Sequence, residues 1–348
     1  MPSRLTIDLD AMAHNHAVLK DAAGGAEVAP VIKADGYGLG VGPIARRLWA
    51  EGARTFFVAR LVEGEALRRE LGERTAAILV LDGAAPGSDE RLRAAKLTPV
   101  LNTLDQARAW RGGEIVLHID TGMNRSGVTL AEANALAREG LKPDLVMSHL
   151  GSAAIPDDPR NAAQLDLFCK AISLFPDARA SLSASSGIYL GPAFRFDMVR
   201  PGISLFGGGP RETPVSWLKP VATLTATILD VRDLKAGDQA GYGSTFTAAR
   251  DMRIAVLDCG YADGLLRASH RGAAGWLAGA RTPLVFVTMD LTAVDVTGCP
   301  HARAGDDVEL LGQNAPLDDL AAAAGTAAHE CLVRLGQRGE RRVLGAAD

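Results

Sequence analysis

The stretch Val28-Ala-Pro-Val-Ile-Lys-Ala-Asp-Gly-Tyr-Gly-Leu-Gly40 decides the fold of this chain. A short apolar run ends at Lys33, and a glycine-rich turn that contains Tyr37 follows it. This pattern is typical of a buried strand leading into a loop, where α/β proteins carry reactive side chains. A lysine removed from water there favours its neutral amine, which can act as a nucleophile or a base. The alternative is a lysine at a strand end that only reaches out to solvent.

Apolar runs alternate with amphipathic segments over the first two hundred residues. The predicted strands are 28–33, 55–59, 76–81, 97–101, 114–120, 144–149, 179–184 and 197–203. The predicted helices are Gly42–Glu51, Val62–Leu71, Leu104–Trp110, Leu130–Glu139 and Asn161–Leu174. Eight nearly continuous apolar strands predict a (β/α)8 barrel, whose parallel strands are covered on both faces. An open doubly wound sheet is the alternative, but its usual G-x-G-x-x-G turn is missing after the first strand.

The pattern changes after about residue 217. Shorter β-like runs follow at Ala222–Val231, Asp251–Asp258, Pro283–Val287, Ala293–Val296 and Asp307–Leu311, separated by turns. One helix at Leu317–Ala324 and a closing strand in the last arginine-rich residues complete the prediction. The chain is therefore divided into a barrel domain, 1–217, and a smaller, mostly β C-terminal domain, 218–348.

Composition excludes several classes of function. The 348 residues are 47% hydrophobic and 22% charged, as in ordinary globular proteins, and the net charge of -4 offers no basic field for nucleic acid. The four cysteines form no C-x-x-C pair, which argues against a zinc site and a disulfide framework. No run approaches the length of a membrane span, and the N-terminus lacks the apolar core of a signal peptide. We expect a cytoplasmic protein that binds no metal.

Polar residues gather directly after the predicted strands, at Lys33, 118–125, His149, 183–186 and Arg200. In a barrel these positions meet at the C-terminal mouth, which makes the mouth the predicted active site. A lysine there can form a Schiff base with a sugar phosphate or with pyridoxal 5'-phosphate. The second possibility needs a partner for the pyridine nitrogen and a phosphate-binding loop.

Two neighbouring strand ends supply those features. Arg200 ends the eighth strand and is followed by the backbone N–H groups of Gly202 and Ile203. Ser186 and Gly187 follow the seventh strand, where barrels often bind phosphate. Together these residues favour pyridoxal phosphate.

Seven motifs give the chain a close resemblance to the alanine racemases, the fold-type III pyridoxal-phosphate enzymes. They are Lys33–Gly40, His118–Gly127, Ser148–Ser152, Val199–Gly207, Ala240–Ala248, Gly260–Gly264 and Thr288–Leu291, in the family's order. The resemblance implies racemisation of alanine in a head-to-tail homodimer, with each active site completed by the partner's second domain. Lys33 would hold pyridoxal 5'-phosphate as an aldimine and act as the base on the D side. Tyr242, from the partner, would be the base on the L side.

The resemblance also implies roles for the other motif residues. Tyr37, Ser186, Gly202 and Ile203 would bind the phosphate. Arg200 would meet the pyridine nitrogen, with His149 beside the ring. Arg125 would approach the cofactor's phenolic oxygen and help to bind the substrate, the partner's Met289 would approach the substrate carboxylate, and Tyr261 would line the entrance.

Four positions depart from the family pattern. His118 stands where a lysine, carbamylated in some members, helps to orient the following arginine. Leu39 replaces a common histidine, Phe206 replaces a tyrosine, and the segment 335–342 has no tyrosine although some members bind phosphate with one in that region. Both predicted bases are kept, so these changes affect affinity and rate more than reaction type.

Other functions remain open on the same scaffold. A broad-specificity racemase acting on serine or other amino acids is one, because discriminating one methylene is worth only ~1–3 kcal/mol. A decarboxylase of the same architecture would need a cysteine-centred motif in the second domain, which is missing. A non-catalytic protein of pyridoxal-phosphate homeostasis would need only the barrel.

Overall fold

The computed structural model describes residues 3–336 and 338–346, which fold into two compact units. We call them the barrel unit, chiefly Ala13–Gly36 with Gly40–Leu205, and the β-rich unit, chiefly Phe206–Gly345 with Tyr37–Leu39 and the residues up to Met12. Residues 1–2, 337 and 347–348 belong to the predicted ranges 1–217 and 218–348 but lie outside the described residues. The boundary at 217 stays a prediction.

The barrel unit confirms the predicted fold class. Its parallel strands are β2 (Glu27–Val28), β3 (Thr55–Val58), β4 (Ala77–Val80), β5 (Thr98–Leu101), β6 (Val116–His118), β7 (Leu145–Met147), β8 (Arg179–Ser181) and β9 (Met198–Val199). Strands β3 to β8 pair in sequence, and β2 pairs with β9. Single parallel bridges, Val31↔Phe57 and Ala184↔Arg200, join these two sets and close the ring.

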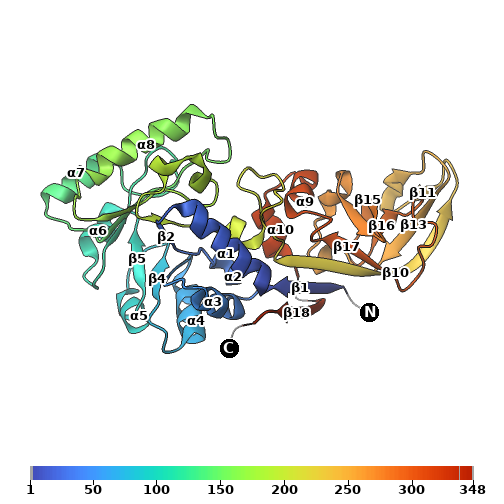
Figure 1. The fold of residues 1–348 in the computed structure, drawn as a ribbon, viewed down its shortest axis with the longest axis horizontal. Coiled ribbons are helices and arrows are strands. Elements are labelled where there is room, and N and C mark those ends of the chain that lie inside the picture. Colours follow the sequence, from blue (N-terminus) through green and yellow to red (C-terminus); the bar gives the residue numbers. More distant parts are fainter. Residues whose placement is uncertain (1–2, 337, 347–348) are drawn as a thin grey trace. The chain divides into compact units, whose positions relative to one another are not determined.

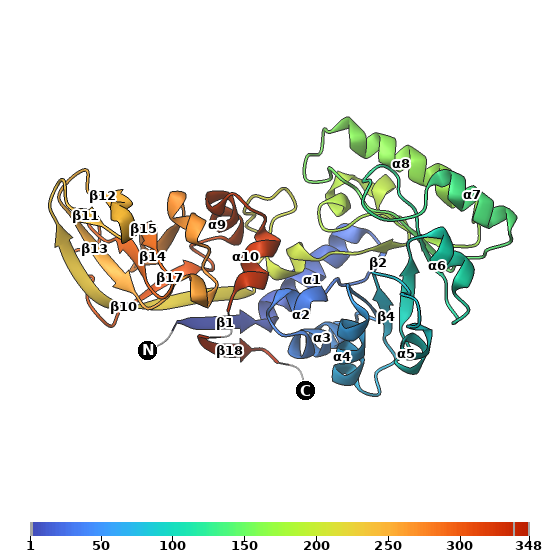
Figure 2. The same ribbon diagram turned by 180° about the vertical axis from the view of Figure 1, so that it is seen from behind.

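Helices cover the strands on the outside (Figures 1 and 2). They are α1 (Leu9–Ala23), α3 (Val41–Ala50), α4 (Leu61–Leu71), α5 (Asp89–Ala94), α6 (Leu104–Ala109), α7 (Leu130–Arg138) and α8 (Pro159–Ile172). Side-chain caps set several helix starts: Thr103 Oγ1 accepts from Gln106 N at 3.1 Å, and Thr129 with Glu132 forms a reciprocal capping box. The barrel interior is filled by buried side chains from most of the strands, among them Phe57, Leu79 and Val100. The mouth residues therefore rest on a packed core.

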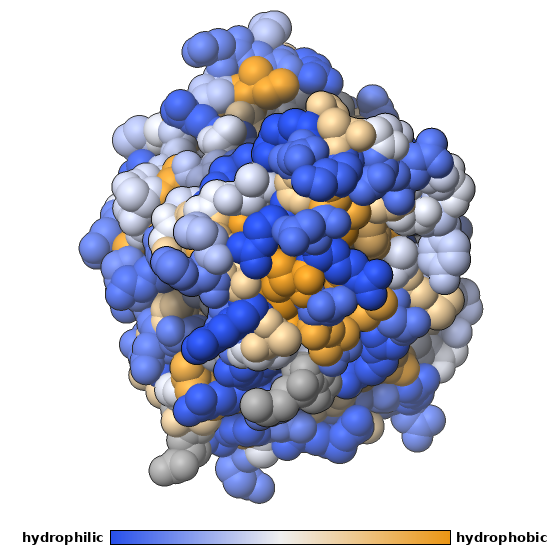
Figure 3. Space-filling view, turned by 90° about the vertical axis from the view of Figure 1, so that its right-hand side faces the viewer, coloured by the Kyte–Doolittle hydropathy of each residue, from blue (hydrophilic) through white to orange (hydrophobic). Residues whose placement is uncertain are grey.

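The β-rich unit is built on one large sheet. Its strand order is β13-β16-β15-β14-β17-β10-β1-β18, and β10 also pairs with β13. The strands are β1 (Arg4–Asp8), β10 (Ala222–Leu234), β13 (Met252–Leu257), β14 (Ala274–Leu277), β15 (Ala280–Val287), β16 (Thr292–Asp295), β17 (Asp307–Leu311) and β18 (Glu340–Leu344). The hairpin of β11 (Gln239–Ala240) and β12 (Phe246–Thr247) and the helices α9 (Leu317–Ala324) and α10 (Ala328–Arg334) complete the unit. The face shown in Figure 3 carries a few apolar side chains surrounded by hydrophilic ones.

The fold differs from the sequence prediction in several elements. The strand predicted to reach Lys33 ends at Val28, because after the bridge at Val31 the chain turns and Lys33 opens the next element, α2 (Lys33–Tyr37). Strand β1 had no prediction, since only two of its five residues, Leu5 and Ile7, are buried. Strand β14, the hairpin of β11 and β12, and helices α1, α5 and α10 were also missed.

Within residues 3–336 and 338–346, no helix is long and apolar enough to cross a membrane. The same residues contain no cluster of three histidine, cysteine or acidic side chains that could hold a metal ion.

Candidate active site

The turn after Lys33 has an unusual backbone. Ala34, Asp35 and Tyr37 have positive φ angles of 52°, 53° and 56°, although none of them is glycine. Left-handed angles cost non-glycine residues on the order of 1–2 kcal/mol each, so the surroundings must hold this turn in place. Glu63 on α4 does so through Oε1, which accepts from Ala34 N at 3.0 Å. Asp35 Oδ1 accepts from Val41 N at 2.8 Å, which makes Asp35 a loop residue.

Lys33 lies in an environment that favours its neutral amine. Burial lowers the pKa of Lys33, and the nearby Arg125 guanidinium lowers it further, while Glu63 and Asp82 act in the opposite direction. Both main causes penalise the charged form. The amine is therefore suited to attack a carbonyl or to take a proton.

Arg200 is a buried cation that has only neutral partners. Its guanidinium donates to Ser181 Oγ and to the carbonyl oxygens of Ser148 and Leu182. Among the described residues it forms no ion pair, and burial lowers its pKa to about 9. A buried charge without a counter-ion is costly, which makes this position suited to an electron-rich or anionic ligand atom.

Two histidines beside these cations are neutral at physiological pH. Burial and the charges of Arg200 and Arg125 lower the pKa of His149 to about 3. The same causes lower the pKa of His118 to about 4. The structure thus brings Lys33, Arg125, Arg200 and both histidines within electrostatic reach of one another, as the barrel prediction required.

The ends of β8 and β9 meet beside Arg200. Ser186 precedes the short 3-10 turn Gly187–Leu190, and Ile203 begins another, Ile203–Phe206. Gly202 N donates to Ser185 Oγ at 3.0 Å, and Ser204 N donates to the same oxygen at 3.3 Å. Ser185 therefore orders the predicted phosphate loop, whereas the sequence motif indicates only its neighbour Ser186 for phosphate binding.

The remaining predicted residues lie in the β-rich unit. Tyr242 is 82% exposed, on the turn between β11 and β12 whose flanking Gly241 and Gly243 have positive φ angles. Met289 is 54% exposed and Tyr261 43% exposed. Tyr261 N donates to Thr288 O at 3.0 Å, so the loops that carry Tyr261 and Met289 are joined.

Tyr37 also belongs to the β-rich unit. Its ring lies 4.5 Å from the ring of Phe206 and 5.8 Å from that of His329, measured between centroids. The side chain is buried, and burial raises the pKa of its phenol. Tyr37 is therefore a neutral donor rather than a base.

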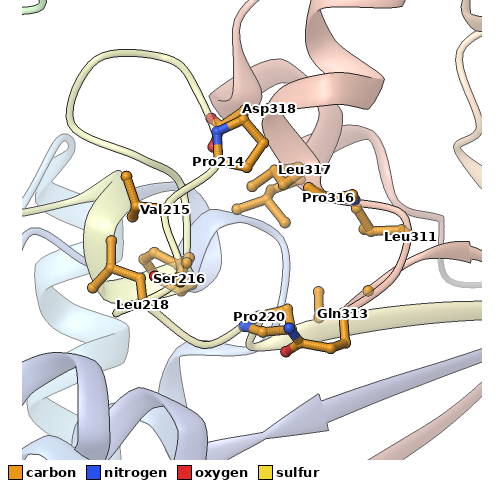
Figure 4. Close-up of a pocket in the computed structure, with 15 residues that line it drawn as sticks. Pro214, Val215, Ser216, Leu218, Pro220, Leu311, Gln313, Pro316, Leu317 and Asp318 are labelled. Atoms are coloured by element: carbon orange, nitrogen blue, oxygen red, sulfur yellow. The ribbon is translucent and has the colours of Figure 1, made fainter.

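One pocket of the β-rich unit contains none of the predicted site residues. It has a volume of about 240 Å³ and is lined mainly by the segments 214–220 and 311–318. Figure 4 shows Asp318 and Pro214 on one side of it and Gln313 and Pro220 on the other. Its lining includes no lysine and no histidine, so it offers no amine for a Schiff base.

Sequence reasoning missed two supporting residues of the barrel mouth. Asn102 follows the predicted strand 97–101 directly, and its Oδ1 lies 2.8 Å from His118 Nδ1. Its position after a strand was the available signal. Glu63 lies inside a predicted helix, where nothing marks it as a support of the lysine turn.

The barrel mouth thus combines a desolvated lysine with two guanidinium groups, and within the described part of the chain no carboxylate pairs with Arg200. This donor set fits pyridoxal 5'-phosphate, an anionic aldehyde whose pyridine nitrogen needs a polar partner. Fold and site together define a barrel enzyme that carries a carbonyl cofactor on a lysine.

Comparison with known proteins gives the family. The models of the alanine racemase N-terminal and C-terminal domains match residues 7–210 and 221–343. An alanine racemase of Methylobacterium sp. is 44% identical, with 98% of each chain covered, and a biosynthetic alanine racemase of Agrobacterium fabrum is 42% identical, with 100% of this chain and 95% of the relative covered. The crystal structure of alanine racemase from Bartonella henselae with covalently bound pyridoxal phosphate superposes with a TM-score of 0.92 at 31% identity, covering 99% of this chain and 100% of the other.

The chain belongs to the alanine racemase family. It is accordingly an isomerase that acts on an amino acid and uses pyridoxal 5'-phosphate.

Proposed function

We propose that the protein interconverts L-alanine and D-alanine with two bases, Lys33 on the D side of the substrate and the partner subunit's Tyr242 on the L side. The observation that carries the proposal is the lowered pKa of the Lys33 amine beside Arg125 at the barrel mouth. A racemase needs one proton acceptor on each face of a planar carbanion, and each must also return a proton. Lys33 and Tyr242 are the residues that match the family's two bases.

Other residues would hold the cofactor. Pyridoxal 5'-phosphate, when bound to the amino acid, acidifies the Cα–H bond. We assign its phosphate to Tyr37, Ser186 and the backbone of Gly202 and Ile203; the N–H of Gly202, which donates to Ser185 Oγ at 3.0 Å, would be shared between that hydroxyl and the phosphate. The neutral phenol of Tyr37 supports this assignment, since it can donate to an anion.

Arg200 would bind the pyridine nitrogen. Its other partners are neutral oxygens, and a guanidinium keeps its protons. It would therefore donate a hydrogen bond to the pyridine nitrogen without protonating it, and less of the carbanion's negative charge would be delocalised into the ring. Neutral His149 beside it would offer no competing acid. Arg125 would approach the substrate and the cofactor's phenolic oxygen, and its charge also keeps the Lys33 amine neutral.

We further propose a head-to-tail homodimer in which the partner's Tyr242, Met289 and Tyr261 complete each site. Large side chains exposed at three motif positions, Tyr242 at 82%, Met289 at 54% and Tyr261 at 43%, support this interface, because a partner subunit would bury them. Met289 would approach the substrate carboxylate, and Tyr261 would line the entrance. We also propose that the domains are 1–217 and 218–348. A cytoplasmic location completes the proposal, and the four cysteines, which form no disulfides, are consistent with it.

The test is D-alanine formation from L-alanine by the holoenzyme, with Lys33→Ala and Tyr242→Phe as variants. Each variant alone should lose nearly all racemisation. In D2O, Tyr242→Phe should still exchange the Cα proton of D-alanine, because Lys33 remains on that face. Lys33→Ala loses the amine that holds the cofactor as well as the base on the D side, and we therefore expect it to exchange neither enantiomer. Full racemisation by Tyr242→Phe would remove the tyrosine from the mechanism.

Mixing the two inactive variants tests the origin of Tyr242. If the tyrosine comes from the partner, half of the randomly formed dimers contain one intact site, and roughly a quarter of wild-type activity should return. If Tyr242 serves its own subunit, the mixture stays inactive. Each variant incubated alone under the same conditions is the control. Serine in place of alanine measures the substrate breadth.

A further inference from the structure

Two loops of the β-rich unit carry Tyr261 and Met289 and are paired through their backbones. Tyr261 N donates to Thr288 O at 3.0 Å, and Ala262 N donates to Met289 O at 2.9 Å. A Cβ added at Gly260 would lie 2.3 Å from Met289 O, so the close approach of the two loops requires glycine there. Each loop also carries an aspartate that this backbone pairing does not use.

Asp263, the aspartate of the first loop, is buried, with 6% of its surface exposed. Gly260 N donates to its Oδ2 at 2.8 Å, and Ser3 Oγ donates to its Oδ1 at 3.3 Å. The guanidinium of Arg338 adds two bonds, from Nε to Oδ1 at 2.9 Å and from Nη2 to Oδ2 at 2.6 Å. This bidentate pair fixes the plane of the guanidinium, which the single ammonium of a lysine could not do.

The third nitrogen of the same guanidinium reaches the second loop. Arg338 Nη1 donates to Oδ1 of Asp290, the residue directly after Met289. Within residues 3–336 and 338–346, Arg338 is the only hydrogen-bond partner of the Asp290 carboxylate. The two carboxylates raise the pKa of Arg338, so that its charge is kept. One arginine thus joins the loop of Tyr261 to the residue beside Met289.

Backbone bonds hold Arg338 in place from both sides. Before it, Gly336 N donates to Asp263 O at 2.8 Å. After it, Glu340 N donates to Ser3 O at 2.9 Å, at the start of β18. The side chain therefore reaches the two loops from a fixed point of the backbone.

We propose that Arg338 is a positioning residue that sets the place of Met289 relative to Tyr261, and with it the substrate entrance that these residues give to the partner subunit's site. The inference rests on the proposed function for the roles of Tyr261 and Met289. The bidentate pair with buried Asp263 fixes the guanidinium, and the remaining nitrogen holds the second loop through exposed Asp290. Without Arg338, the Asp290 carboxylate loses its partner and the second loop is held by its backbone bonds alone.

Variants at the two ends of this contact test the inference. In the holoenzyme, Asp290→Ala removes an exposed carboxylate with no other partner and should raise KM for alanine on the order of fivefold, with little change in kcat. Arg338→Lys should also raise KM, because one ammonium cannot bind both carboxylates. Arg232→Met is the control: it removes an exposed ion pair with Asp230 and should leave KM unchanged.

The double variant separates positioning from a general loss of stability. Because Asp290→Ala and Arg338→Lys break the same contact, their combination should raise KM by less than the product of the single effects. An unchanged KM in Asp290→Ala overturns the inference, even if Arg338→Lys lowers the thermal midpoint. A full product of the two effects overturns it as well.

A spectroscopic measurement is independent of catalysis. In protein labelled with ¹³C-methyl methionine, the Met289 signal, assigned by its loss in Met289→Leu, should shift in Arg338→Lys and stay in place in Arg232→Met. If the Met289 signal stays in place in Arg338→Lys, the inference fails although alanine is racemised. If the signal shifts but the wild type racemises no amino acid, the proposed function fails instead.

Discussion

Replacing His16 with leucine should make the protein less sensitive to acid. His16 lies on α1, is 2% exposed, and its Nε2 has no hydrogen-bond partner among the described residues. Burial lowers its pKa from 6.5 to about 4, and Lys20 adds to the effect while Glu51 opposes it. The folded protein therefore binds this proton less tightly than the unfolded chain does. Stability is lost as the pH falls from 6.5 to about 4.

The magnitude follows from the pKa difference. Each pH unit below 6.5 costs about 1.4 kcal/mol until the folded histidine itself titrates, so His16 removes about 2 kcal/mol from the free energy of unfolding at pH 5. Its effect at pH 7 is small. His118 and His149 have pKa values of about 4 and 3. In the wild type they add to the loss of stability as the pH falls.

Urea unfolding of wild type and His16→Leu at pH 7 and pH 5 gives the measurement, at one protein concentration and one cofactor concentration. The free energy of unfolding of His16→Leu, relative to that of wild type, should be about 2 kcal/mol higher at pH 5 than at pH 7. Leu19→Met on the same helix is the control, because it changes packing without a titrating group and should show no shift. An equal pH dependence in wild type and His16→Leu would refute the reasoning.

Two further predictions concern the barrel mouth. Gly127→Ala should cost about 1–3 kcal/mol of stability, because Gly127 has a φ of +112° and an added Cβ would lie 2.7 Å from Asp120 N. Thermal unfolding measures this loss of stability, and an unchanged midpoint temperature in Gly127→Ala would contradict the assigned loop geometry. Arg200→Glu should increase transamination, measured as pyruvate released from alanine, since a carboxyl partner favours a protonated pyridine. Unchanged by-products would exclude this role for Arg200.

The sequence was sufficient for the barrel and for the composition of its mouth. Lys33, His149 and Arg200 each follow an apolar strand, and parallel strands bring such positions together whatever lies between them. Each of the eight predicted strands overlaps an observed one, because buried parallel strands are marked by continuous apolar runs. The predicted strand ends were less accurate: β2 ends at Val28, five residues before Lys33, where the prediction placed its end.

Long-range partners could not be predicted. The pairing of β1 with β18 joins Arg4 to Glu340, and no local pattern indicates a neighbour so distant in sequence. The support of Ala34 by Glu63 and the contact of Asn102 Oδ1 with His118 Nδ1 depend on atomic distances that a motif does not contain. The amide of Asn102 is oriented by the carbonyl groups of Leu81 and Val100, which no motif indicates either.

The pairing of β1 with β18 has a consequence for the order of folding. Strand β1 lies between β10 and β18, so one of its edges stays open until residues 340–344 have been synthesised. Closing a flexible loop of this length would cost about 5 kcal/mol in chain entropy, but a barrel that has already folded shortens the effective loop. Until then, the nascent chain exposes one side of its first strand. During that interval, the open edge of β1 is where a second nascent chain could pair by mistake.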